Sequence, residues 1–166
     1  MKLVQVFIAH SSRDKWLIDA ICENLTLRGV APYLAELEDP TPLPLPEKLD
    51  VAIKTSNALF LIITSSAMQN RQTRDVLNWE TATAHAYQKP VYVFAEKGID
   101  VPLLINYISV YFTFDPITRE SLKEMMVRVH KTAIELKEVE DKGKAAAFIV
   151  ASLLGLLVLG SVLGKK

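Results

Sequence analysis

The sequence predicts an α/β protein, with a five-stranded parallel sheet, helices on both faces, and a C-terminal transmembrane helix. Five short apolar runs alternate with segments of helical periodicity. Three of these runs are almost continuously hydrophobic, as expected for strands that are covered on both faces. A later run of 20 uncharged residues, 145–164, is long enough to cross a bilayer as a helix.

The five predicted strands cover residues 3–9, 30–35, 58–64, 90–96 and 108–114. Because helical segments separate them, the strands are expected to run parallel. Ligands of such sheets bind where the strands end. The segments directly after the strands, including residues 10–14 and 65–74, are therefore the first places to look for a site.

Four helices are predicted, at residues 12–28, 47–55, 75–88 and 118–140. The first begins with an S-x-x-D capping pattern, Ser11 with Asp14, and ends at Gly29. Its inner stripe is formed by Leu17, Ile18, Ile21 and Leu25. The stripe of the last helix is formed by Leu122, Met126, Val129, Ala133 and Leu136.

These elements divide the chain into a domain (1–136), a polar linker (137–143), a transmembrane helix (144–164) and a two-residue tail (165–166). A soluble hairpin or an unusual core helix is the alternative for the apolar run. So short a tail leaves the domain on the side of synthesis, as a cytoplasmic domain on a single-pass anchor in the lipid bilayer. The only cysteine, Cys22, permits no intrachain disulfide, which agrees with the cytoplasm.

Several functions are disfavoured by what the sequence lacks. With 19 basic and 19 acidic residues there is no charge excess that would favour nucleic acid as a partner. Neither a phosphate-binding G-x-x-x-x-G-K-[ST] loop nor a dinucleotide-binding G-x-G-x-x-G motif is present. One cysteine and three scattered histidines make a zinc site improbable. We therefore expect no metal and no bound cofactor.

The helix predicted at residues 75–88 carries an acid on its apolar side. On a wheel of about 100° per residue, the core-facing arc is formed by Val76, Leu77, Ala84 and Tyr87. The solvent-facing side is formed by Asn78, Thr81, His85 and Gln88. Glu80 falls in the middle of the apolar arc, where a carboxylate is uncommon unless it is paired or functional.

Glu80 also has two ordinary interpretations, a helix rotated so that the acid is exposed, or an ion pair with Arg74. A second open question concerns residues 36–46, which hold four of the eight prolines. Prolines in alternation favour extended backbone. That loop is either a stiff connector or a rigid flap or docking strip above the strand ends.

Residues 3–115 resemble a TIR (Toll/interleukin-1 receptor) domain of the bacterial and archaeal type. The opening VFIAHSSRDKWL is similar to the strand, turn and first helix of the family. The block from residue 33 to 67 is similar to its long BB loop, helix and strand ending in serine. WETATAHAYQKPVYVF is similar to the acidic helix that precedes a KP strand. The resemblance implies a flavodoxin-like fold.

Many TIR domains of this type hydrolyse or cyclise NAD+, with a glutamate on the helix before the KP strand. The resemblance thus implies that Glu80 is the catalytic carboxylate and NAD+ the substrate. It implies that His10, Ser11 and Ser12 approach the nicotinamide ribose or the phosphates. Ser65 and Trp79 are further candidates for the wall of the substrate site.

Two other functions remain open beside this one. A non-catalytic scaffold would act through homotypic contacts between TIR domains, although scaffolds of this family generally lack the glutamate. A nucleoside-processing enzyme of related architecture would use a similar glutamate. The enzyme and scaffold hypotheses both predict self-association, with other TIR proteins as possible partners, in signalling or defence. A membrane tether would favour such association by raising the effective concentration.

Overall fold

The computed structural model describes residues 3–34, 45–101 and 105–142. Its strands are β1 (Val4–Ala9), β2 (Val30–Leu34), β3 (Ala58–Ile63), β4 (Val91–Glu96) and β5 (Val110–Phe114). Its longer helices are α1 (Lys15–Thr26), α2 (Leu45–Thr55), α4 (Arg71–Ala86) and α5 (Arg119–Lys142). Short helical turns are η1 (Ser12–Asp14), α3 (Ser65–Gln69) and η2 (Ile105–Tyr107). Each predicted strand is present.

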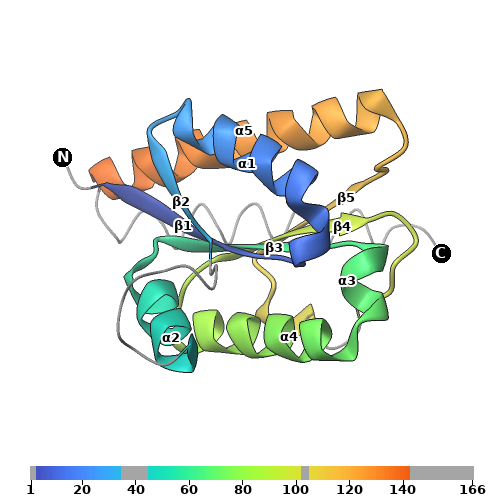
Figure 1. The fold of residues 1–166 in the computed structure, drawn as a ribbon. Coiled ribbons are helices and arrows are strands. Elements are labelled where there is room, and N and C mark those ends of the chain that lie inside the picture. Colours follow the sequence, from blue (N-terminus) through green and yellow to red (C-terminus); the bar gives the residue numbers. More distant parts are fainter. Residues whose placement is uncertain (1–2, 35–44, 102–104, 143–166) are drawn as a thin grey trace.

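The five strands form one parallel sheet in the order β2-β1-β3-β4-β5. This order is the flavodoxin-like form of the doubly wound fold, in which ligands bind beside β1 and β3. All strands end at the same edge of the sheet, the carboxyl edge, on the right in Figure 1. The prediction of a parallel five-stranded sheet is confirmed.

Two helical layers cover the sheet, and the alternation of side chains along each strand supplies both cores. Helices α1 and α5 cover one face of the sheet, and α2 and α4 cover the other (Figure 1). Val6 and Ile8 of β1 pack in the core on the side of α1 and α5, whereas Phe7 and Ala9 pack on the side of α2 and α4. The interior of β3 is buried on both faces, as its uninterrupted apolar sequence predicted.

Helix α1 follows its predicted pattern closely. All four residues of the expected stripe are buried, and Gly29 ends the segment with a positive φ of 69°. The capping pattern is only partly correct. Ser11 accepts a hydrogen bond from Arg13 N, but the helix is preceded by the turn η1, and the Asp14 side chain makes no capping bond.

Helix α4 begins four residues earlier than predicted, at Arg71 rather than at residue 75. The side chain of Asn70 caps it by accepting a bond from Thr73 N, so a polar first turn is stable here. The preceding α3 was not predicted. It is a single short helix capped by Thr64, which accepts from Ala67 N.

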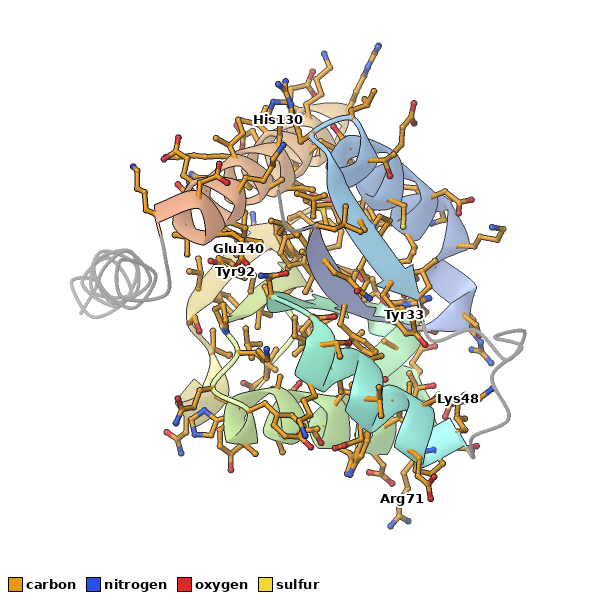
Figure 2. The ribbon with its side chains drawn as sticks, turned by 90° about the vertical axis from the view of Figure 1, so that its left-hand side faces the viewer. Tyr33, Lys48, Arg71, Tyr92, His130 and Glu140 are labelled. Carbon is orange, nitrogen blue, oxygen red and sulfur yellow. The ribbon has the colours of Figure 1, made fainter. Side chains whose placement is uncertain are left out.

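Helix α5 packs along the other face and ends at the amino edge of the sheet, opposite to the carboxyl edge. Val129, Ala133 and Leu136 of the predicted stripe are buried, and Leu122 and Met126 are half-buried against the core. The helix continues to Lys142, through most of the predicted linker. Glu140 accepts a bond from Asn57 Nδ2 at 2.9 Å, and Figure 2 looks onto this edge.

Two predictions concern residues outside the described parts of the chain. The transmembrane helix at 144–164 is one, and most of the proline-rich loop at 36–46 is the other. In the described residues, the structure has no helix that is both long enough and apolar enough to span a membrane.

Candidate functional site

Glu80 lies in α4 with 4% of its surface exposed, as the wheel predicted. Its Oε2 is buried and has no hydrogen-bond partner among the described residues. Arg74 is exposed, and no ion pair between described side chains includes Glu80. A carboxyl group in this state is energetically unfavourable unless something else binds it, which makes Glu80 the first candidate for a functional group.

The wheel was wrong about two neighbours of Glu80. Val76 was expected in the core but is 42% exposed, and Thr81 was expected in solvent but is fully buried. The helix is rotated so that Leu77 and Ala84 mark the middle of the buried side. Thr81 is tolerated there because its hydroxyl donates to Leu77 O at 2.7 Å.

The side of α4 that carries Glu80 faces α2. Tyr87, seven residues after Glu80 and therefore on the same stripe, donates its hydroxyl to the Asp50 carboxylate of α2 at 2.8 Å. Helix α4 runs from the carboxyl edge toward the amino edge (Figure 1). Glu80 lies about 10 Å nearer to the carboxyl edge than Tyr87, by the helical rise.

Burial raises the pKa of Glu80 from 4.5 to about 8. The cause is loss of solvation, since the charged carboxylate is poorly stabilised in an apolar setting. With a pKa of about 8, the side chain is mainly protonated at neutral pH. A cationic ligand placed beside it would favour the carboxylate and lower this pKa again.

Three further candidates lie together in the turn after β1. His10 is half-buried, and its Nδ1 contacts Ile8 O at 2.9 Å. Since a carbonyl oxygen only accepts, Nδ1 carries the proton, and Nε2 of the neutral ring is an acceptor. Ser11 is buried and Ser12 is exposed at the start of η1. These residues can offer acceptors and hydroxyl groups to a ligand at the carboxyl edge.

Ser65 and Trp79 occupy different surroundings. Ser65 is the first residue of α3 at the carboxyl edge, and its N–H already donates to Glu96 Oε2 at 2.7 Å. Its exposed hydroxyl is the group that remains for a ligand. Trp79 adjoins Glu80 in α4 and is 40% exposed, on the outer side of the helix. Among the described residues, no hydrogen bond or ion pair joins either side chain to Glu80.

A second buried acid was missed by the sequence reasoning. Asp14 is 7% exposed and accepts hydrogen bonds from Thr64 Oγ1 at 2.5 Å and Ser66 Oγ at 2.7 Å. We call these three residues the edge cluster. The sequence feature that could have identified this cluster is the presence of short polar residues directly after β1 and β3, two strands that are neighbours in this fold. The sequence pattern alone predicts a helix cap and a strand end at these positions. Within the described residues, no group of side chains forms a metal site.

Comparison with known proteins identifies structures of the same fold. No family model matches the chain, and no curated protein sequence matches it. The CMP N-glycosidase BcmB of Clostridium botulinum superposes with a TM-score of 0.54 and 16% identity, over 74% of this chain and 98% of that one. The Flv1 flavodiiron core of Synechocystis sp. PCC6803 gives 0.50 and 18%, over 82% of this chain and 36% of that chain.

An archaeal flavodoxin is similar at a TM-score of 0.47 and 19% identity, over 82% of this chain and 99% of the flavodoxin. None of the three proteins named here is a TIR domain. At such identities the likeness is one of fold. Together with the strand order, the likeness to BcmB shows that the described part of this chain is an α/β domain with a flavodoxin-like parallel sheet.

Proposed function

We propose that this protein is a membrane-tethered enzyme that hydrolyses the N-glycosidic bond of a ribonucleotide, with NAD+ as the expected substrate and Glu80 as the reacting carboxyl group. One observation carries the proposal. Glu80 is buried on the α2 side of α4, and its Oε2 has no partner among the described residues. The resemblance to TIR domains names the substrate, and the uncharged run at 145–164 supports the tether.

The chemistry suits a single carboxyl group. Cleavage breaks the bond between ribose C1′ and the pyridinium nitrogen, and the bonding electrons leave with nicotinamide, which becomes neutral. No proton is needed on this leaving group. An ionised Glu80 would stabilise the oxocarbenium-like charge and bind the ribose hydroxyls. Water then adds to C1′ and releases a proton, or the adenine ring of the same molecule adds instead and gives a cyclic product.

The raised pKa of Glu80 is compatible with this role because the substrate is itself cationic. Binding of the pyridinium ring beside the carboxyl group would favour loss of the proton. In the free enzyme, Glu80 must still lose its proton before it can act as a carboxylate. The value of kcat/KM for NAD+ should therefore rise with pH and level off above about 8.

A second candidate function is hydrolysis of a nucleoside monophosphate such as CMP. The fold likeness to a CMP N-glycosidase and the protonated state of Glu80 both favour it. A neutral pyrimidine is a poorer leaving group than nicotinamide, and a protonated carboxyl group can donate to it as it departs. In this case kcat/KM should fall, not rise, as pH passes about 8.

The test measures kcat/KM for NAD+ and for CMP from pH 6 to 9.5, using the full chain in lipid vesicles, beside Glu80→Gln. We expect loss of NAD+ that rises with pH, and a decrease of about 10²-fold or more in the variant. Glu23→Gln, which changes an exposed acid of α1, is the matched control and should retain activity.

Cleavage of CMP alone, with the opposite pH profile, would assign the second function. Equal activity of wild type and Glu80→Gln would show that another group is responsible. If densely clustered wild-type protein leaves both nucleotides intact, the enzyme proposal is wrong, and the non-catalytic scaffold becomes the better explanation.

A further inference from the structure

The edge cluster joins the ends of two neighbouring strands. Asp14 belongs to the turn after β1, and Thr64 and Ser66 belong to the turn after β3. Each oxygen of the Asp14 carboxylate accepts one hydrogen bond, Oδ2 from the Thr64 hydroxyl and Oδ1 from the Ser66 hydroxyl. Asp14 and Thr64 are almost completely buried, so these charge-assisted bonds form away from most of the solvent.

Helix capping does not account for the position of Asp14. It stands at the N-cap of α1, where a carboxylate normally accepts from the first turn of the helix. Its side chain makes no such bond, because it is turned toward α3. Instead of capping α1, the Asp14 carboxylate contacts residues about 50 positions away in the chain.

The same bonds restrain the residues that precede Asp14. Asp14 N donates to Ser11 O at 3.0 Å, which closes the turn from Ser11 to Asp14. The side chain of Ser11 accepts from Arg13 N at 3.3 Å within that turn. Restraint of the Asp14 carboxylate therefore restrains Ser11 and Ser12, two residues expected to contact the substrate.

The first turn of α3 also contacts a third strand end. Ser65 N donates to Glu96 Oε2 at the end of β4, at 2.7 Å. Three consecutive residues, Thr64 to Ser66, thus bind partners after β1 and at the end of β4. These strands lie on either side of β3 in the sheet.

We infer that Asp14 is a positioning residue for nucleotide binding. By accepting from Thr64 and Ser66, it holds the turn formed by His10, Ser11 and Ser12 in the geometry that contacts the substrate. This inference rests on the proposed function. It assigns Asp14 no contact with the substrate. Loss of the edge cluster should therefore weaken substrate binding more than it slows the chemical step.

The test compares Asp14→Ala, Thr64→Val and Thr64→Ser in the full chain on vesicles. Asp14→Ala removes the acceptor but retains the α3 cap made by Thr64. Thr64→Val removes the donor and the cap, whereas Thr64→Ser retains both. For the first two variants we expect KM for the cleaved nucleotide to rise about tenfold with kcat within about twofold. Thr64→Ser should behave as wild type.

Amide hydrogen exchange gives a readout that does not depend on activity. In Asp14→Ala and Thr64→Val, exchange at residues 11–13 should accelerate about tenfold, while exchange in α4 should be unchanged. A merely destabilised protein would exchange faster throughout.

The outcomes separate this inference from the proposed function. Active wild type with an unchanged KM in Asp14→Ala would overturn the positioning role, and so would unchanged exchange at residues 11–13. An effect of Thr64→Val without one of Asp14→Ala would assign the effect to the α3 cap and also overturn it. Wild type that cleaves neither nucleotide would overturn the proposed function, and the positioning role with it.

Discussion

At the scale of single residues, Glu80 is costly to the fold. The unfolded chain exposes this carboxyl group to water, where it titrates near 4.5, but the folded protein holds it where burial raises its pKa to about 8. A side chain placed against the preference of its surroundings is typical of a functional site. The opposing demands of stability and chemistry at Glu80 can be measured separately.

Glu80→Gln should stabilise the protein in a pH-dependent manner. Below pH 4.5 the wild-type side chain is protonated in both states, so the two proteins should differ little. Between pH 4.5 and about 8 the unfolded state releases the proton and the folded state retains it, so wild-type stability falls as pH rises. Above about 8 the difference stays constant, at about 5 kcal/mol as an upper estimate.

Urea denaturation of both proteins at pH 4.5, 6.5 and 8.5 measures this difference in the free energy of unfolding. The exposed-acid variant Glu23→Gln should show no comparable trend. A constant difference between wild type and Glu80→Gln across this range would mean that the Glu80 carboxyl group is solvated in the folded state.

At the scale of elements, the hydrophobic periodicity of the sequence predicted correctly those buried faces that depend on one segment alone. The buried stripe of α1 was correct because four apolar residues at helical spacing leave one possible orientation. For α4 the same method was wrong about Val76 and Thr81, because the rotation of a mixed helix is set by what it packs against. The burial of Glu80 was still predicted, since it lies near Leu77 and Ala84.

The edge cluster could not be predicted in this way. Its bonds join residues 50 and 52 positions apart, and each residue had a plausible local role. Only the adjacency of β1 and β3 in the sheet brings them together. Residues that act through long-range contacts are thus the ones that sequence patterns miss. The turn from His10 to Ser12, by contrast, was a candidate from the sequence because it directly follows a strand, and its contact with substrate stays a prediction.

The end of α5 offers a test at the same scale. Asn57 accepts from Gln5 N at 2.9 Å through Oδ1 and donates to Glu140 through Nδ2. Asn57→Ala removes both bonds and leaves the part-buried Gln5 N–H without its acceptor, so stability should fall by about 1–2 kcal/mol. Asn57→Asp retains the Oδ1 acceptor but places a carboxylate beside Glu140.

Denaturation together with hydrogen exchange distinguishes these two effects. Asn57→Asp should accelerate exchange in the last turns of α5 and leave the Gln5 amide protected. Asn57→Ala should accelerate exchange at both places, in the last turns of α5 and at the Gln5 amide. If neither variant changes exchange near Lys142, the end of α5 is held by its apolar contacts, such as that of Leu136, and not by this hydrogen bond.

At the scale of the whole molecule, the turn after β1 and the end of α5 lie at opposite edges of the sheet. The turn after β1 and the edge cluster are at the carboxyl edge, whereas α5 ends at the amino edge (Figure 1). A membrane anchor that follows Lys142 would therefore place the amino edge near the bilayer. The carboxyl edge would face the aqueous phase, where a soluble nucleotide and other copies of the domain can reach it.

The two tryptophans make this orientation measurable. Trp16 is the second residue of α1 at the carboxyl edge, and Trp79 is in α4, in the layer on the other side of the sheet from α5. Both are partly exposed. In vesicles containing brominated lipids, whose quenching acts only at short range, the fluorescence of the full chain should be nearly unquenched. Adding a third tryptophan by Leu3→Trp, at an exposed position beside the start of β1, should produce quenching.

Quenching of the wild-type protein would mean that the carboxyl edge or α4 lies on the membrane, which would restrict access to Glu80. If neither protein is quenched although both sediment with the vesicles, the domain stands away from the bilayer on residues beyond Lys142. If neither sediments, the tether is absent, and any NAD+ cleavage must be carried out by a soluble enzyme. The same vesicles, loaded at increasing protein density, then show whether confinement to a surface raises activity, as association between domains predicts.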